Sequence, residues 1–167
     1  SAVMLSGETA MGKYPVQAVE TMSTLAIRAE ASLSEYGFLQ KITPNPSSRV
    51  TEAVAQSAVN MAHKLGSSAI FSMTDTGFTS RLISKHRPEC PIVAIMRSRP
   101  VARRLAMNWG VTPILYVGEG DDEAKLEFAL KEARRLGLVA NGDTVVVTSG
   151  YQQTAGGTDL IRIITID

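Results

Sequence analysis

The sequence has one cysteine, few aromatic residues and no long hydrophobic run. With Cys90 alone, the chain can form neither an internal disulfide nor a cysteine-based zinc site, which favours a reducing, cytoplasmic location. No apolar stretch approaches the roughly 20 residues that span a bilayer. The first residues also lack the basic segment of a signal peptide. We therefore expect a cytoplasmic protein with no membrane partner.

The sequence also has no excess of either charge, because its 17 Lys and Arg residues nearly balance its 16 Asp and Glu residues, for a net charge of +1. Nucleic-acid-binding domains usually carry a basic excess or stripe. The one local cluster of arginines, within residues 97–104, has no interleaved aromatic side chains to stack on bases. Neither histidine has Cys, Asp or Glu at metal-ligand spacing. We expect no nucleic-acid partner and no metal bound by this chain.

What is present is the composition of an ordinary globular protein: 167 residues, 44% hydrophobic and 20% charged. This length fits one domain, or one domain with an appendage. Residues 35–48 combine glycine, prolines and serines, which is typical of a linker between residues 1–34 and residues 49–167. The chain opens inside an apolar, strand-like run at residues 1–5, so we expect a piece of a longer protein.

Residues 49–167 alternate between amphipathic helical patterns and short strands rich in Val and Ile. This alternation predicts a mostly parallel sheet covered by helices on both faces. About ten residues without helical pattern join the last two strands, too few for a parallel crossover, so the last strand should be antiparallel. We predict a three-layer α/β/α sandwich with a five-stranded mixed sheet in the order 3-2-1-4-5. The expected strands are 69–73, 92–95, 111–117, 144–148 and 160–166.

Two helices have informative patterns. In the helix expected over residues 49–65, an apolar stripe recurs at helical spacing through Val50, Val54, Ala58 and Met61. A second helix is expected from Pro15 to about residue 34, because proline suits the first turn of a helix.

The first candidate binding segment follows the strand at 69–73 and opens a helix. Its members combine hydroxyl groups with a glycine at a helix N-terminus: Thr74, Thr76, Gly77, Thr79 and Ser80. Backbone N–H groups, hydroxyls and the helix dipole at such a place favour a phosphate. Simple N-capping of the helix by one of the threonines explains the same residues. The pattern alone does not separate these interpretations.

The second candidate segment, residues 149–158, leaves the strand at 144–148 and includes Gln152, Gly156 and Gly157. In the predicted order, the first and fourth strands are neighbours at a switch point, where both loops would face one crevice. A glycine-rich connection without any ligand is the alternative.

The N-terminal loop, residues 7–14, nearly fits the phosphate-binding pattern G-x-x-x-x-G-K-[ST]. Tyr14 stands where that pattern needs a hydroxyl for Mg²⁺, and Pro15 starts the helix after the lysine, which argues against a P-loop. Ser6 and Glu8 flank a glycine at the carboxyl end of an apolar run, a position that often carries chemistry in parallel α/β proteins. A plain strand-to-helix turn is the alternative.

Together these segments resemble the pyruvate kinase family along the whole chain. The resemblance is carried by AVMLSGETAMGKYPVQAV at residues 2–19, RPECPIVA at 87–94, WGVTP at 109–113, GDTVVVTSG at 142–150 and GTD at 157–159. It implies that residues 1–34 are the last strand and helix of a catalytic (β/α)₈ barrel. Residues 35–48 would be the linker and residues 49–167 the C-terminal regulatory domain, with a five-stranded mixed sheet.

The resemblance also implies an activity for the parent protein. Pyruvate kinases transfer phosphate from phosphoenolpyruvate to ADP in glycolysis, giving pyruvate and ATP, with Mg²⁺ and usually K⁺. The family's catalytic lysine and its metal-binding Glu and Asp lie upstream of residue 1, so we expect this chain to be inactive and to bind neither ion. Ser6 and Glu8 match positions at the edge of the active site, and Ser6 resembles a member of the relay that delivers a proton to the enolate.

The resemblance further implies a sugar-phosphate effector between the loops matching Thr74–Thr79 and Gln152–Gly157, with help from Lys125. Members that bind fructose 1,6-bisphosphate typically carry basic residues in these loops, whereas this sequence has Asp75 and Gln152. A bisphosphate would lose charge-assisted contacts there. We therefore predict a monophosphate effector, such as a sugar phosphate or AMP, or none, rather than the bisphosphate.

The resemblance implies a homo-oligomer as well, since pyruvate kinases are usually tetramers whose C-terminal domains meet across one interface. Two other interpretations stay open on sequence alone. One is a free-standing, flavodoxin-like module that binds a phosphorylated ligand. The other is a domain whose main task is assembly.

Overall fold

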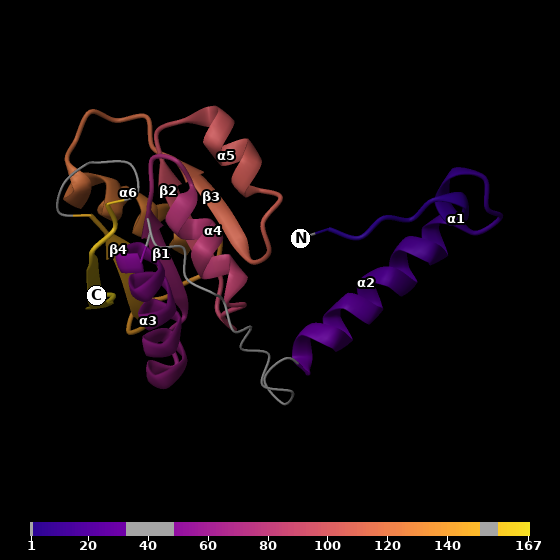
Figure 1. The fold of residues 1–167 in the computed structure, drawn as a ribbon, viewed down its shortest axis with the longest axis horizontal. Helices are drawn as coiled ribbons and strands as arrows, with labels where there is room; N and C mark the ends of the chain where they lie inside the picture. Colours follow the sequence, from indigo (N-terminus) through magenta and orange to yellow (C-terminus); the bar gives the residue numbers. More distant parts are fainter. Residues whose placement is uncertain (1, 33–48, 151–156) are drawn as a thin grey trace. The chain divides into compact units, whose positions relative to one another are not determined.

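The computed structural model describes residues 2–32, 49–150 and 157–167. The chain divides into two compact units, residues 1–40 and residues 41–167. Figure 1 shows the helices and strands of each unit along the chain.

The first unit contains a short helix, α1 (Gly7–Ala10), and a long one, α2 (Pro15–Ala31), which begins at the proline as expected. The expected strand does not form over the described residues 2–5. A β-strand needs a neighbouring strand to bond its backbone, and the apolar side chains Val3 and Met4 of this segment lie exposed. No residue of α2 is buried either, so the unit has helical structure without a core around α2.

The second unit has the predicted topology. A five-stranded sheet runs in the order β3-β2-β1-β4-β5, with all neighbouring pairs parallel except β4 and β5. Its elements are α3 (Arg49–Leu65), β1 (Ala69–Met73), α4 (Phe78–Lys85), β2 (Ile92–Met96), α5 (Arg99–Leu105), β3 (Val111–Leu115), α6 (Asp122–Arg135), β4 (Thr144–Ser149) and β5 (Leu160–Thr165). The short connection before β5 therefore does reverse the chain, as its length required.

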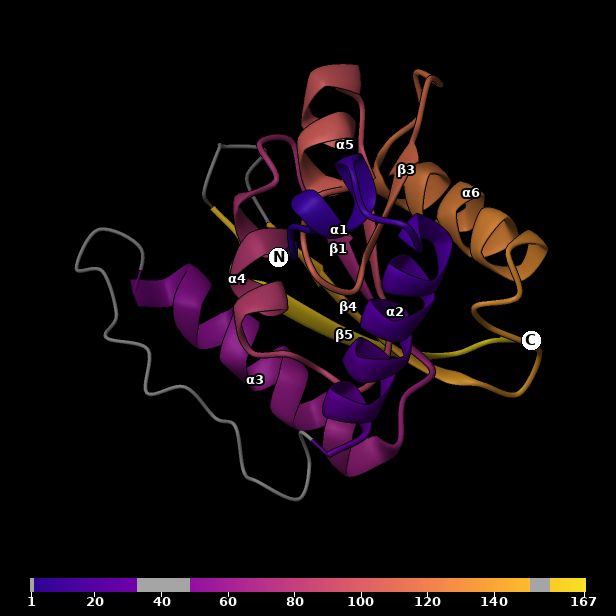
Figure 2. The same ribbon diagram turned by 90° about the vertical axis from the view of Figure 1, so that its right-hand side faces the viewer.

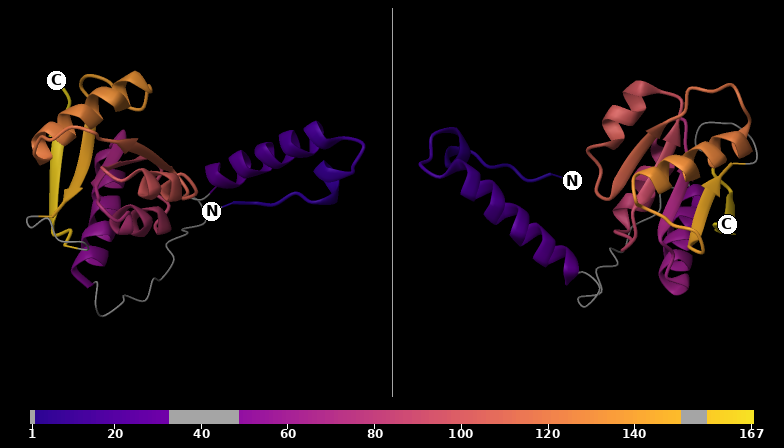
Figure 3. Two further views of the ribbon diagram at one scale, coloured as in Figure 1. Left: turned by 90° about the horizontal axis from the view of Figure 1, so that it is seen from above. Right: turned by 180° about the vertical axis from the view of Figure 1, so that it is seen from behind.

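The sheet separates two hydrophobic cores, because successive strand residues point to opposite faces. On β1, Ile70 packs into the core under α3, α4 and α5, while Ala69 and Phe71 pack into the core under α6. Figures 2 and 3 show α6 on one side of the strands and the other three helices on the opposite side. This is the predicted three-layer sandwich.

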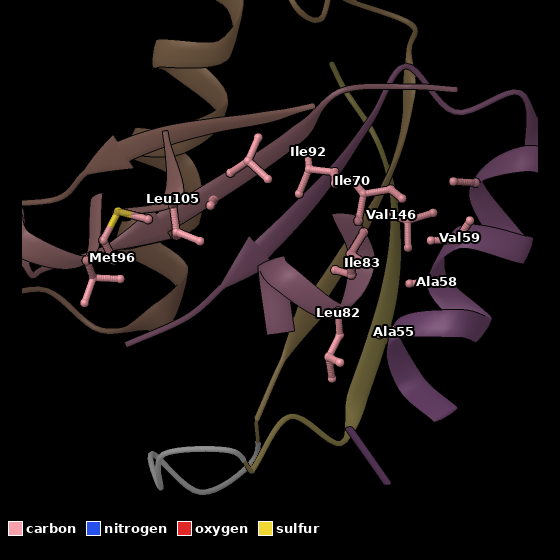
Figure 4. Packing of buried hydrophobic residues seen from close by; sticks show 14 residues of the cluster. Ala55, Ala58, Val59, Ile70, Leu82, Ile83, Ile92, Met96, Leu105 and Val146 are labelled. Carbon is pink, nitrogen blue, oxygen red and sulfur yellow. The ribbon is translucent and has the colours of Figure 1, made fainter. Parts of the chain in front are cut away.

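Helix α3 buries a face made of small residues: Thr51, Ala55, Ala58, Val59 and Ala62. Figure 4 shows Ala55, Ala58 and Val59 facing Val146 on the sheet. Of the apolar stripe noted in the sequence, Ala58 alone is fully buried, whereas Val50 and Met61 are 62% and 38% exposed. Small side chains on the inner face let α3 approach the sheet closely, and the larger apolar residues are left outside.

Candidate functional site

The two candidate loops leave the same edge of the sheet. Ser72 on β1 pairs with Thr148 on the parallel strand β4, so both strands end at this edge. On β4, Ser149 pairs with Leu160, the first residue of the antiparallel strand β5, which therefore begins there. The loop after β1 and the segment before β5 are neighbours in space.

The start of α4 combines a left-handed glycine with hydroxyl groups. Gly77 precedes the helix with φ +79°, and its N–H donates to Thr74 Oγ1 at 2.9 Å. Phe78 N–H donates to Thr76 Oγ1 at a longer 3.4 Å. Gly77 is itself the N-cap residue, and as a glycine it has no side chain that could cap the helix. First-turn N–H groups have no partner within any α-helix, so at α4 those that follow Phe78 are open to an anion or water.

Gly77 cannot be replaced without strain. A left-handed conformation costs an L-residue about 1–2 kcal/mol, and a Cβ here would also lie 3.1 Å from Leu105 Cδ2 and Cγ. We expect Gly77→Ala to lower the free energy of unfolding by about 1–2 kcal/mol in urea titrations. Gly142→Ala is the matched control, since Gly142 has φ +86° but open space around it. A loss no larger than that of the control would show that crowding against Leu105 does not contribute, and no loss would contradict the prediction.

The two loops are joined through a pair of threonines. Thr79 Oγ1 in the first turn of α4 lies 2.6 Å from Thr158 Oγ1, just before β5. Both side chains are buried, with exposed fractions of 2% and 7%. The sequence analysis included Thr158 in the second candidate segment but did not single it out as a site residue. Its position beside the edge where β5 must begin is the signal that could have identified it.

Ser80, another predicted site residue, faces the sheet. Its hydroxyl donates to Ser72 Oγ at 2.9 Å, and both residues are fully buried. Nearby, Thr148 Oγ1 donates to the carbonyl oxygen of Phe71 at 3.4 Å. The Ser80 hydroxyl therefore ties α4 to β1, whereas Thr74 is half-buried and Thr76 is exposed.

Lys125 lies in α6, the helix that covers the opposite face of the sheet from α4. Its ammonium group bonds the carboxylate of Asp122 in the same helix. A phosphate would have to share this lysine with Asp122. Gln152 and Gly156 lie outside the described residues, while Gly157 is half-buried beside Thr158.

In the first unit, Ser6 is the N-cap residue of the short helix α1 and Glu8 lies in its first turn. The Ser6 N–H donates to Glu8 Oε2 at 2.9 Å, and the Ser6 carbonyl oxygen accepts from Thr9 and Ala10. Backbone N–H groups of Glu8 and Ser6 bond the carboxylate and hold the pKa of Glu8 below its ordinary value. These contacts account for the helical turn, where the sequence suggested a loop.

The described part of the chain has few side chains suited to metal binding or to thiol chemistry. There, no group of three or more His, Cys, Asp or Glu side chains could hold a metal ion. Burial raises the pKa of the Cys90 thiol to about 11, which leaves little reactive thiolate at neutral pH. Among the described helices, none is long and apolar enough to cross a membrane.

The fold and this edge define an α/β domain with a mixed, mostly parallel sheet. The loop after β1 and the segment before β5 meet at the carboxyl ends of β1 and β4, where such domains bind ligands. Residues 52–164 match the family model described as "Pyruvate kinase, alpha/beta domain". The chain belongs to the pyruvate kinase family.

Individual relatives agree along nearly the whole chain. It is 38% identical to a pyruvate kinase of Bacillus licheniformis over 165 residues, which cover 99% of this chain and 28% of the relative. The identity is 41% to a pyruvate kinase of Lactococcus lactis, covering 99% of this chain and 33% of the relative. The identity is 38% to pyruvate kinase 1 of Saccharomyces cerevisiae, covering 98% of this chain and 34% of the relative. The chain thus spans about a third of the length of these relatives.

Proposed function

We propose that the chain is the C-terminal part of a cytoplasmic pyruvate kinase that transfers phosphate from phosphoenolpyruvate to ADP in glycolysis. In this proposal residues 1–34 complete the catalytic barrel, residues 35–48 form a linker and residues 49–167 form a regulatory domain. The family match over residues 52–164 supports this assignment.

In the same proposal, phosphotransfer with its Mg²⁺, K⁺ and nucleotide belongs to the rest of the parent enzyme. Ser6 and Glu8 would border that active site and take no part in catalysis by this chain alone. The described residues offer no acidic cluster suited to Mg²⁺, so we assign no step to the ion here. We expect no pyruvate formation from phosphoenolpyruvate and ADP by the purified chain, and measurable turnover would contradict this assignment.

The regulatory role rests on one observation, the contact between Thr79 and Thr158 that brings the two loops together. We propose that a phosphate binds at the start of α4, with its oxygens accepting from first-turn N–H groups and from the hydroxyls of Thr74 and Thr76. The helix dipole favours an anion at this end. The conformation of this turn would be set by Gly77, Thr79 and Ser80.

The charge at this edge favours a monophosphate over a bisphosphate. Asp75 is exposed in the loop beside Thr74 and Thr76, and it would repel a second phosphate group. Lys125, the basic residue that we assign to the site, lies in α6 on the other face of the sheet from α4, and it is bonded to Asp122. We therefore propose AMP or a sugar monophosphate as the effector, with fructose 1,6-bisphosphate binding more weakly. Gln152, Gly156 and Gly157 would complete the site.

A ligand panel tests the effector assignment. AMP, ribose 5-phosphate, glucose 6-phosphate and fructose 1,6-bisphosphate would be compared by thermal shift and calorimetry. A monophosphate at 100 times its Kd should stabilise the domain by about 2.7 kcal/mol. Asp75→Asn should strengthen bisphosphate binding, whereas Glu127→Gln, an equal charge change at an exposed residue of α6, should not. Tighter binding of the bisphosphate to the unaltered chain would contradict the monophosphate assignment, and no binding at all would contradict regulation by phosphates.

A second role, assembly, is favoured by the last strand. Strand β5 pairs with β4 on one side and stands at the end of the sheet order, and its Leu160 and Ile163 are about half exposed. An open edge strand can pair with another chain. We propose that this edge joins two copies of the domain, as part of a tetramer in the parent enzyme. Ile163→Lys should then shift the chain toward monomer in sedimentation velocity, and a strict monomer before substitution would contradict the proposal.

A further inference from the structure

We propose that Thr158 is a positioning residue of the anion site, acting through the hydroxyl of Thr79; this inference rests on the regulatory site proposed above. Thr158 does not belong to the helix whose N–H groups would bind the phosphate. Its Oγ1 nevertheless lies 2.6 Å from Thr79 Oγ1, inside the first turn of that helix. Since both side chains are buried, water cannot easily replace one partner when the other is lost.

The first turn of α4 is held from two sides by neighbouring residues. Ser80 bonds Ser72 on the central strand β1, and Thr79 bonds Thr158 next to the edge strand β5. The helix has only eight residues, follows a left-handed glycine and has no side-chain N-cap. Short helices depend on such tertiary contacts for their stability. The Thr79–Thr158 pair thus fixes the direction in which the first-turn N–H groups point.

Thr158 is itself held firmly against the sheet. The N–H of the next residue, Asp159, donates to the carbonyl oxygen of Ser149 at 3.1 Å, and Leu160 pairs with Ser149 in the antiparallel ladder. The hydroxyl pair therefore connects the anion site to the beginning of β5. Because coupling between two sites is reciprocal, an anion bound at α4 should also order the beginning of β5.

The test compares two substitutions of Thr158 in the full chain. Thr158→Val keeps the shape of the side chain and removes its hydroxyl, whereas Thr158→Ser keeps the hydroxyl. With inorganic phosphate and AMP as probes in calorimetry, we expect Thr158→Val to raise the Kd roughly three- to tenfold, the range given by one hydrogen bond. Thr158→Ser should stay within about twofold of the unaltered chain. Thr165→Val, an exposed threonine near the other end of β5, is the matched control.

A second readout is amide hydrogen exchange at residues 159–161. Phosphate or AMP should slow exchange there in the unaltered chain and in Thr158→Ser, and this protection should be lost in Thr158→Val. A Thr158→Val protein that unfolds more easily but keeps the same Kd and the same protection would show a purely structural role and overturn the inference.

The outcomes also separate this inference from the proposed function. If the unaltered chain binds inorganic phosphate but none of the phosphorylated metabolites, the effector assignment fails and Thr158 is still judged by the phosphate Kd. If the unaltered chain binds no phosphate of any kind, the regulatory site and the inference fail together. If it binds AMP and Thr158→Val binds equally well, the inference alone fails.

Discussion

Replacing Phe71 with alanine should lower the free energy of unfolding of the second unit by about 3–5 kcal/mol, the range for a large aromatic residue in a packed core. Phe71 heads the fully buried side chains in order of volume. It lies on β1, the central strand, and packs into the core under α6. The loss has two parts: the favourable free energy of moving the ring out of water is lost, and the cavity left behind costs further stability. Domains commonly have only 5–15 kcal/mol of stability, so this variant would be only marginally folded.

Urea unfolding followed by the fluorescence of Trp109 measures this loss. Trp109 is the single tryptophan and lies half-buried in the same unit, so its signal reports on the unfolding of this unit. Met107→Ala serves as the control, because Met107 is 65% exposed and its truncation opens no cavity. Equal midpoints for the two variants would mean that the core under α6 is not what holds the unit together.

The fold of the second unit could be predicted almost completely from the sequence. Parallel strands covered on both faces are nearly continuous runs of apolar residues, and the runs expected at 69–73, 92–95 and 144–148 are mostly apolar. The length of the last connection then decided that β5 is antiparallel. What the pattern could not give was the inner face of α3. Its alanines make a weaker hydrophobic signal than Val50 and Met61, although close packing on a sheet selects small side chains.

The first unit shows a different limit. The local pattern of Pro15 and the residues after it was enough to predict a helix, because helical hydrogen bonds form within one segment. The apolar run before it forms no strand over the described residues 2–5, because a strand depends on partners elsewhere in a protein. A sequence pattern can show that a segment is suited to a sheet, but the segment forms a strand only when neighbouring strands are there to bond its backbone.

At the candidate site, the sequence could predict the place but not the direction of each side chain. Topology alone puts the ends of β1 and β4 at one edge, and the contact between Thr79 and Thr158 lies there. Thr79 and Ser80 are consecutive hydroxyl residues that the sequence treats alike. One bonds Thr158 across the edge and the other bonds Ser72 on the sheet, because adjacent helical residues point about 100° apart.

Ser80 therefore allows a direct test of structural against ligand-binding roles. Its hydroxyl donates to Ser72 Oγ in a fully buried pair. Ser80→Ala removes the donor and leaves the Ser72 hydroxyl buried without this partner, which should lower the free energy of unfolding by about 1–3 kcal/mol. The double variant with Ser72→Ala removes both polar groups. It should be destabilised by clearly less than the sum of the two single variants, because no unpaired hydroxyl remains.

The same variants decide whether the Ser80 hydroxyl also contacts an effector. If it only ties α4 to β1, the double variant should restore much of the stability and bind AMP with a Kd close to that of the unaltered chain. If the hydroxyl bonds a phosphate oxygen, both Ser80 variants should bind AMP more weakly, whatever their stability. Additive losses of stability in the double variant would contradict the buried pair itself, because two independent hydroxyls have no interaction free energy to lose.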